Sequence, residues 1–527
     1  MKKIWLLSAL ISQMFIKVNS QESYWQQKVD YKIQVTLNDQ QKTLKGQLHL
    51  QYTNQSPDTL TYIWFHIWPN AYKNEQTALF KQFRKLNSNK NNSEKITYGW
   101  IDSLQFKING NTVKTEAHPE WNDVIKLPLS TPLLPGNSIK IETPFFVKLP
   151  SYFSRSGFDN NQFMICQWYP KPAVYDRKGW HAMPYLDQGE FYSEYGNFEV
   201  SINIPSSYVV GATGALQQEA ELQAYKKIGN LNLQNRKTGK WESYHPASIN
   251  KTKTLTFKAE NVHDFAWFAN KDFIIQYDTL QLKSGKTVDV FSYKQPNGNP
   301  SWRNSTAFIK DAAKNYSNWI GEYPYPVVQA VEGPVNSSSG GMEYPMITLI
   351  TSPDADEEGL DAVITHEIGH NWFYGILGSN ERQHPWMDEG LNTYFEMRYE
   401  AEKYRSNSVF GASIPIDLKE LSAAEFLDRI YGALNKLPSM KGIIDQPAAE
   451  FKDQDSYATL VYLKTSVWFY ILENMIMKDV KDQGIQTYFE QWKFKHPYPE
   501  DMQRSLEAAT GKDLKSFFEL LKKEESF

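Results

Sequence analysis

The hydrophobic pattern of the chain changes its period once, and this change constrains the fold more than any other sequence feature. From Tyr31 to about residue 270, apolar and polar residues alternate, as at Tyr31, Ile33 and Val35. Such alternation is typical of β-strands with one buried face. After about residue 285, apolar residues recur at helical spacing, first over residues 309–320. The pattern therefore predicts an N-terminal β region followed by an α-rich region.

The length of 527 residues exceeds one usual domain and indicates two or three. We divide the chain into a signal peptide at residues 1–20, a β domain at 21–272 and a second domain at 273–527. The polar segment 217–253 is expected to be an exposed insertion in the β domain. In the second domain we expect strands at 327–331 and 346–350 and a strongly apolar helix over 462–476.

The N-terminus has the features of an export signal. Lys2 and Lys3 precede an apolar stretch over residues 4–16, and a cleavage point follows near Gln21. The stretch is shorter than the roughly 20 residues of a membrane span, although a permanent N-terminal anchor stays open as an alternative. We expect an exported protein, periplasmic or secreted and bacterial, without a stable membrane span. Its one cysteine, Cys166, excludes an intrachain disulfide.

The charge of the chain gives no reason to expect a nucleic-acid partner. The formal net charge is -4, and no strongly basic run occurs. The aromatic content of 14% suits large β surfaces or clefts for peptides and carbohydrates, and does not choose between them. Nothing in the sequence assigns an oligomeric state.

The strongest chemical signal is the pentapeptide from His366 to His370. Two histidines four residues apart lie on one face of a helix, close enough to share a metal ion. Catalytic zinc keeps three protein ligands and one open position, and Glu367 between the histidines is suited to act as general base. The pentapeptide alone also occurs in helices whose histidines are solvated or packed, so a third ligand is needed.

Glu389 is the expected third ligand. Eighteen residues separate it from His370, and two glycines in between allow the chain to turn back. A second helix from Glu389 to about residue 400 would then present its carboxylate to the ion. Asp388 is the competing carboxylate, and both could instead favour a helix N-terminus. His384 precedes a proline in an expected loop and is interpreted as non-ligating.

The two histidines, the glutamate and the spacing between them form a pattern. This pattern resembles the motif of the alanyl aminopeptidase (aminopeptidase N) and leukotriene hydrolase family of gluzincin zinc metallopeptidases. The resemblance extends over residues 31–518. It implies an N-terminal β-sheet saddle domain followed by a thermolysin-like, mainly α-helical catalytic domain. It also implies one Zn²⁺ ion held by His366, His370 and Glu389, and peptide substrates.

Further motifs resemble those of the same family. Gly341, Met342 and Glu343 match its exopeptidase motif, in which the glutamate is expected to bind the α-ammonium of the substrate. Tyr344 replaces the asparagine of that motif, which leaves the peptide-backbone contacts open.

Two tyrosines and a glutamine are the remaining candidate site residues. Tyr457 and Tyr462 match the tyrosine pair of the family, and Tyr462 is expected to hydrogen bond to the oxyanion. Tyr457 fits core packing and substrate binding equally well. Gln167 occupies the place where the N-terminal domain of the family reaches the substrate, or is a partly buried glutamine at a β edge.

These residues predict a zinc-dependent aminopeptidase that removes N-terminal residues from peptides. A zinc-activated water and Glu367 as general base would carry the reaction. A zinc endopeptidase and an inactive, peptide-binding homologue remain as alternatives. The first-residue preference is not readable from the sequence.

Overall fold

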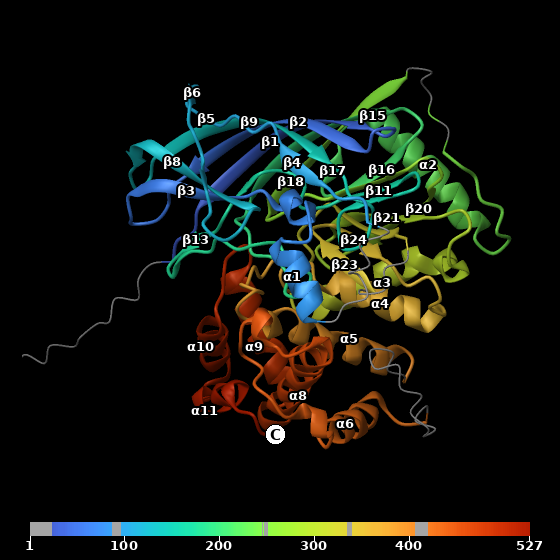
Figure 1. Ribbon diagram of the computed structural model, residues 1–527. Helices are drawn as coiled ribbons and strands as arrows, with labels where there is room; N and C mark the ends of the chain where they lie inside the picture. Colours follow the sequence, from blue (N-terminus) through green and yellow to red (C-terminus); the bar gives the residue numbers. More distant parts are fainter. Residues whose placement is uncertain (1–23, 87–95, 245, 247–250, 335–339, 406–419) are drawn as a thin grey trace, which may run out of the picture.

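The computed structural model describes residues 24–86, 96–244, 246, 251–334, 340–405 and 420–527. A β-rich N-terminal part lies above a mainly helical C-terminal part (Figure 1). The predicted α+β class, with a β domain before a helical one, is confirmed. The predicted export signal lies outside the described residues. No helix in the described ranges is both long and apolar enough to cross a membrane.

A nine-stranded sheet forms the top layer. Its order is β17-β18-β15-β1-β2-β9-β5-β6, and β4 also pairs with β9. Alternate residues of β1 are buried, among them Val29, Tyr31 and Ile33, as the alternating pattern predicts. The strands are β1 Lys28–Asn38, β2 Thr43–Thr53, β4 Trp100–Asp102, β5 Lys107–Ile108, β6 Asn111–Thr112, β9 Ser138–Lys148, β15 Gly196–Pro205, β17 Ala215–Leu216 and β18 Thr252–Val262.

Smaller sheets connect this layer to the rest of the molecule. The order β10-β11-β19-β16 forms a sheet in which β11, β16 and β19 are buried on both faces. A second sheet has the order β12-β3-β8-β7, and β13 pairs with β14. The strands are β3 Leu60–His66, β7 Glu116–Ala117, β8 Val124–Leu133, β10 Gly157–Asp159, β11 Gln162–Ile165, β12 Lys171–Pro172, β13 Tyr175–Asp176, β14 Gly179–Trp180, β16 Val209–Ala212 and β19 Trp267–Asn270.

A separate five-stranded sheet, in the order β20-β21-β22-β24-β23, begins the C-terminal part. The chain changes sheet between Asn270 and Ile274, while the exact domain division at residue 272 stays a prediction. Gln329 on β22 donates to the carbonyl of Ala212 at 2.8 Å and ties this sheet to the β domain. The strands are β20 Ile274–Gln281, β21 Thr287–Lys294, β22 Val327–Glu332, β23 Gly341–Tyr344 and β24 Ile347–Ile350.

Helices fill the rest of the C-terminal part and pack beneath this sheet (Figure 1). α10 opens with Pro499, and Gly511 follows it in the left-handed conformation with a φ of 67°. The α-helices described in this part are α3 Ser305–Trp319, α4 Glu357–Gly369, α5 Glu389–Lys403, α6 Ala423–Leu434, α7 Gln454–Tyr457, α8 Thr465–Ile476, α9 Lys478–Trp492, α10 Pro499–Thr510 and α11 Lys515–Phe518, whereas α1 Ala78–Lys85 and α2 Glu219–Asn235 belong to the β domain.

The polar segment 217–253 differs from its prediction as an exposed insertion. Its first half is the helix α2, which packs on β20 and buries Tyr225, Gly229 and Asn232. A Cβ at Gly229 would lie 2.5 Å from the Cβ of Tyr277, so the glycine permits this close contact. Asn232 donates to the carbonyl of Ile275 at 2.9 Å. Three buried residues, one of them a glycine, are too few to predict such a helix from a polar sequence.

A buried ion pair under β12 gives a first prediction. The Nζ atom of Lys171 lies 2.9 Å from Asp264, and both side chains are almost fully buried. Lys171→Met should lower the free energy of unfolding by about 3–5 kcal/mol, because it leaves the Asp264 carboxylate buried without a cation. Urea titration followed by tryptophan fluorescence measures the change. Lys32→Met, which breaks the exposed pair with Glu199, is the matched control and should have a much smaller effect. Equal effects of the two would contradict the prediction.

Candidate metal centre

Helices α4 and α5 position the three predicted metal ligands. Asp356 caps the start of α4 by accepting a hydrogen bond from the amide of Gly359 at 2.8 Å. The helix ends at Gly369, and His366 and His370 lie one turn apart at this end. The chain then returns, and Glu389 is the first residue of α5. A Cβ at Gly369 would lie 2.0 Å from Oδ1 of Asn392, so the glycine allows α5 to approach α4.

The ligand atoms of these residues converge on one point. The Nε2 atoms of His366 and His370 are 3.0 Å apart. Each lies 3.3 Å from the Oε2 atom of Glu389. Donors around a tetrahedral zinc ion, with bonds of about 2.0–2.1 Å, are separated by about 3.3 Å. The three residues therefore fit zinc in both donor type and spacing.

The outer nitrogens of both histidines are held by carboxylates. Nδ1 of His366 lies 2.8 Å from Glu396, and Nδ1 of His370 lies 2.6 Å from Asp388. A carboxylate accepts a proton-bearing Nδ1, which leaves each Nε2 with its lone pair toward Glu389. Two lone pairs and a carboxylate at this distance require a cation between them. Asp388, the competing carboxylate in the sequence, thus orients His370 in the structure.

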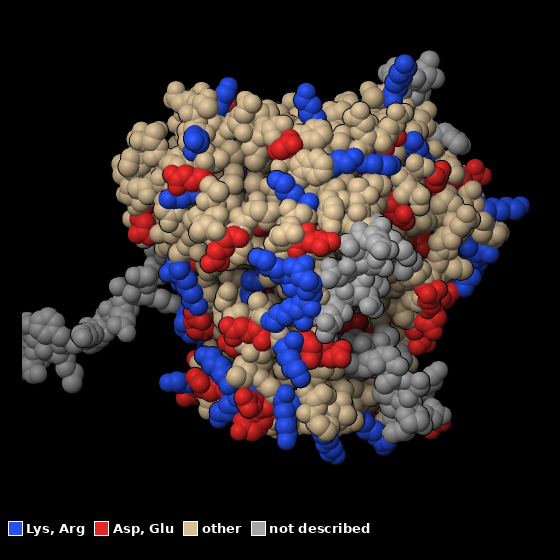
Figure 2. All heavy atoms as spheres, viewed as in Figure 1, with Lys and Arg blue, Asp and Glu red and all other residues tan. Residues whose placement is uncertain are grey.

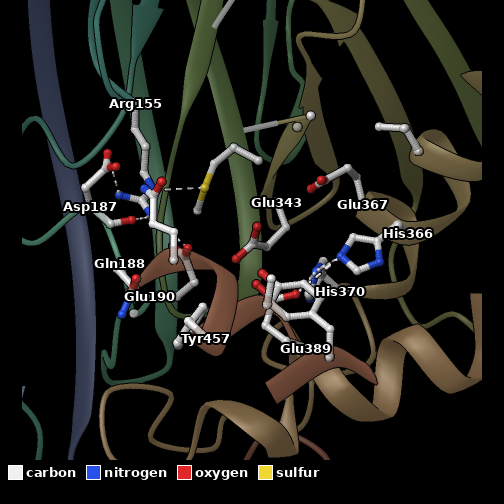
Figure 3. A pocket seen from close by; sticks show the side chains of 18 of the residues that line it. Arg155, Asp187, Gln188, Glu190, Glu343, His366, Glu367, His370, Glu389 and Tyr457 are labelled. Atoms are coloured by element: carbon white, nitrogen blue, oxygen red, sulfur yellow. Dashed lines mark hydrogen bonds and ion pairs between the residues drawn. The ribbon is translucent and has the colours of Figure 1, made fainter. Parts of the chain in front are cut away.

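Six of the seven other predicted site residues meet the ligands in one cavity of about 540 Å³ (Figure 3). Its lining includes the predicted general base, the exopeptidase motif and the tyrosine pair, namely Glu367, Gly341, Met342, Glu343, Tyr457 and Tyr462. The motif lies on β23, which pairs on one side with β24 and forms the edge of its sheet. A Cβ at Gly341 would lie 2.4 Å from Oε1 of Glu367, so only glycine leaves room for that carboxylate.

A π-helical turn presents Tyr462 to the cavity. The sequence predicts one helix over 462–476, but residues Ala458–Lys464 form a π-helical turn and α8 begins at Thr465. The Nζ atom of Lys464 donates to the carbonyls of Gly442 at 2.6 Å and Glu525 at 2.8 Å, which holds the turn in place. The ring of Tyr462 stacks on His366, with centroids 6.1 Å apart. Turns of this type often occur at functional sites.

The structure does not bring Gln167 together with the other predicted site residues. It is buried and is not among the described residues that line the cavity. Its Nε2 atom lies 3.5 Å from Asp264, at the limit of a hydrogen bond. The strand β11, which ends at Ile165, pairs with β19 and directs the following residues into the β domain. His384 is not among the lining residues either, and its Nδ1 atom pairs with Asp445 at 2.6 Å.

A loop of the β domain supplies the wall that sequence reasoning missed. Asp187, Gln188 and Glu190 lie across the cavity from the histidines (Figure 3). Arg155 holds this loop, because its guanidinium donates to Oε1 of Glu190 at 2.6 Å and to the carbonyl of Asp187 at 2.8 Å. Gly189, at a φ of 85°, lets the loop pack against Ala448 and Arg382. Because this loop is short and polar, no hydrophobic periodicity in the sequence predicts its position.

Burial dominates the electrostatics of the cavity. It raises the pKa of Glu367 to about 7 and the pKa of Glu343 well above its usual range. Burial also raises the pKa of Glu190, and the pKa of Glu381 rises further beside Asp388. A cation bound in the cavity would favour the ionised form of these carboxyl groups.

Comparison with known proteins identifies the helical part. Residues 311–520 match the family model described as Peptidase family M1 domain. Leucine aminopeptidase 2 of Emericella nidulans is 32% identical over 163 residues, which span 30% of this chain and 24% of that protein. A leukotriene A-4 hydrolase homolog of Botryotinia fuckeliana is 29% identical over 182 residues, 33% of this chain and 26% of that protein. The chain thus matches about a quarter of the length of these relatives.

Solved structures extend the likeness to the whole fold. An M1 zinc metallopeptidase from Deinococcus radiodurans has a TM-score of 0.62 and 15% identity, and the match covers 95% of both chains. Aminopeptidase A of Legionella pneumophila, solved with aspartic acid, has a TM-score of 0.63 and 14% identity. That match covers 94% of this chain and 49% of the other. At these identities the likeness shows a shared fold, and the predicted resemblance to this family is confirmed.

Proposed function

The chain contains a peptidase family M1 domain, and from this premise we propose that it is a zinc-dependent aminopeptidase acting on peptides. One observation carries the proposal: the three metal donors, Glu367 and Glu343 lie in the same cavity. A non-enzymatic homologue would not need this complete set. The donor geometry supports a single zinc ion. Among the similar structures, a Deinococcus radiodurans M1 zinc metallopeptidase variant is bound to a Tyr-Ser-Ala substrate, and a two-domain M1 zinc metallopeptidase variant is bound to L-arginine.

Glu343 and Glu190 are the groups that would recognise a free N-terminus. Oε1 of Glu343 and Oε2 of Glu190 are buried and have no hydrogen-bond partner among the described residues. An α-ammonium between them would donate charge-assisted hydrogen bonds to both. Glu343 lies between the loop and the histidines (Figure 3), so a substrate anchored there would have its first peptide bond toward the metal donors.

The reaction then requires proton transfer and charge stabilisation. When bound, a zinc ion would polarise the peptide carbonyl and lower the pKa of a water molecule in the site. Glu367 would accept the proton of the attacking water on a carboxylate oxygen and pass it to the leaving amine. The hydroxyl of Tyr462 would donate to the oxyanion, a contribution worth about 3 kcal/mol. Tyr457, beside Tyr462 with ring centroids 6.0 Å apart, would contact the substrate from the same wall.

Unblocked and N-acetylated aminoacyl anilides test the aminopeptidase assignment directly. The zinc-loaded protein should release the chromophore from unblocked anilides and leave the acetylated ones intact. Equal cleavage of both, or cleavage within blocked peptides, would instead establish the endopeptidase alternative. Protein that takes up no metal would revive the inactive, peptide-binding alternative.

Glu343→Gln gives the sharper prediction. It keeps the shape of the side chain and removes the charge that pairs with the α-ammonium, so kcat/KM for unblocked anilides should fall about 10²-fold or more. Steady-state kinetics measure the loss. Glu358→Gln, on the exposed side of α4, is the matched control and should retain wild-type rates. Wild-type kinetics in Glu343→Gln would remove this residue from substrate recognition.

Export to the periplasm or the medium is a separate part of the proposal. It rests on the two lysines and the apolar stretch at the N-terminus. Cell fractionation of the full chain, compared with a chain lacking residues 1–20, tests it.

A further inference from the structure

The wall of the cavity that faces the metal centre is rich in hydrogen-bond acceptors. Figure 3 shows Asp187, Gln188 and Glu190 on this wall, with Glu343 between them and the histidines. An N-terminal residue anchored at Glu343 has to place its side chain in the space that the metal, Glu343 and Tyr462 leave free. The loop wall borders that space, so its chemistry selects the first side chain of the substrate.

Unpartnered polar atoms in this part of the cavity are acceptors. The buried side-chain atoms of the lining that lack a partner among the described residues are Gln188 Oε1, Glu190 Oε2, Glu343 Oε1 and Glu367 Oε2. Nε2 of Gln188 donates to the carbonyl of Ala448 at 3.0 Å, which fixes the amide with its oxygen free. The α-ammonium would take Glu343 and Glu190, and Glu367 would face the attacking water, so Oε1 of Gln188 is the buried acceptor left for a donor on the first side chain.

The charge of the lining leads to the same conclusion. Seven acidic side chains and one arginine line the cavity, so acidic groups stay in excess after a divalent ion and one α-ammonium are bound. Arg155 is already engaged, since it donates to Glu190 and to two backbone carbonyls of the loop. Behind the lining, Glu381 is 1% exposed, and both of its oxygens lack a partner among the described residues. A low-dielectric cleft concentrates such a field.

We propose that the subsite formed by the loop of Asp187, Gln188 and Glu190, with Asp455 at its rim, selects a cationic first residue, arginine or lysine. The inference rests on the aminopeptidase function proposed above and names its substrate class. A guanidinium offers five N–H donors and no acceptor, which suits the unpartnered Oε1 of Gln188 and the negative charge of Asp455 at the rim. A glutamate or aspartate side chain would add negative charge to a cavity already in excess and would be rejected.

Neutral analogues of the same size separate charge from shape. Arginyl and citrullinyl anilides differ in the charged group and little in volume, and so do glutamyl and glutaminyl anilides. The zinc-loaded enzyme should cleave the arginyl anilide with a kcat/KM about tenfold or more above the citrullinyl one, and the glutamyl anilide more slowly than the glutaminyl one. Added salt should lower the arginyl rate more than the citrullinyl rate.

A variant at the rim tests the wall itself. Asp455→Asn should lower the arginyl-to-citrullinyl ratio of kcat/KM several-fold, because Asp455 is an exposed carboxylate of the lining. The matched control is Asp479→Asn, an exposed acid of α9 outside the lining, which should keep the wild-type ratio. A citrullinyl rate equal to or above the arginyl rate, or an unchanged ratio in Asp455→Asn, would overturn the proposed selection.

Failure of the proposed subsite can be told apart from failure of the aminopeptidase function on which it rests. If no unblocked anilide is cleaved, the aminopeptidase proposal fails, and calorimetry with arginine amide and citrulline amide then tests the subsite alone. Tighter binding of arginine amide would support the cationic subsite without catalysis. Equal binding of the two amides would refute it.

Discussion

Glu367→Gln should lower kcat by about 10²- to 10⁴-fold while the protein keeps its full metal content. Glutamine has nearly the same shape but cannot accept the proton of the attacking water. Glu367 lies on α4 between the two histidine ligands, and its carboxylate packs against Gly341 of the edge strand. The oxygen atom Oε2 has no partner among the described residues, so the substitution breaks no structural hydrogen bond there.

Metal analysis and single-turnover kinetics on the same preparation make this test decisive. Loss of rate with stoichiometric zinc assigns Glu367 to proton transfer. Loss of both rate and zinc would mean that the residue supports the metal site instead. Glu358→Gln, an exposed glutamate on the same helix, shows whether any such substitution in α4 disturbs the enzyme. A Glu367→Gln variant with most of its rate would refute the general-base assignment.

His370→Ala should abolish both stoichiometric zinc and activity. It removes one of three converging donors and leaves the Asp388 carboxylate, which is 0% exposed, without the imidazole that it holds. Wild-type protein treated with a chelator should lose activity and regain it when zinc is added. The variant should not regain activity under the same treatment.

Asp388→Asn is a milder variant whose metal affinity is compared with that of His370→Ala. An amide still accepts the hydrogen bond of His370 but carries no charge, so metal affinity should fall about 10- to 100-fold instead of being lost. Competition with a chromophoric chelator measures both affinities. Equal zinc affinity in His370→Ala and wild type would show that the histidine is not a ligand.

Periodicity and spacing were sufficient to predict the parts of the molecule whose interactions are local in sequence. The alternation at Tyr31, Ile33 and Val35 predicted a strand with one buried face, and β1 has this form. His366 and His370 share one helical turn, so their relative position follows from helix geometry. The prediction that Glu389 is a ligand required only that a second helix begin at that residue, and α5 begins there.

The rest of the site depends on tertiary packing that no local pattern encodes. Glu190 reaches the cavity because Arg155 and Arg382, distant in sequence, bind its loop from both sides. The sequence suggested Gln167 for this role. Gln167 follows β11, which pairs with β19 in the β domain, and it does not line the cavity. The π-helical turn before Thr465 likewise depends on Lys464 binding carbonyls near the C-terminus. Each case joins segments more than thirty residues apart.

The two walls of the cavity come from different parts of the chain, and each wall would contribute a different property, reactivity or selectivity. Metal donors and general base all come from one helical pair, whereas the wall that meets the first side chain belongs to the other half of the molecule. In the function proposed here, reactivity and selectivity therefore come from different structural units. Exchange of the loop of Asp187, Gln188 and Glu190 among relatives should change which peptides are trimmed while the catalytic step stays intact.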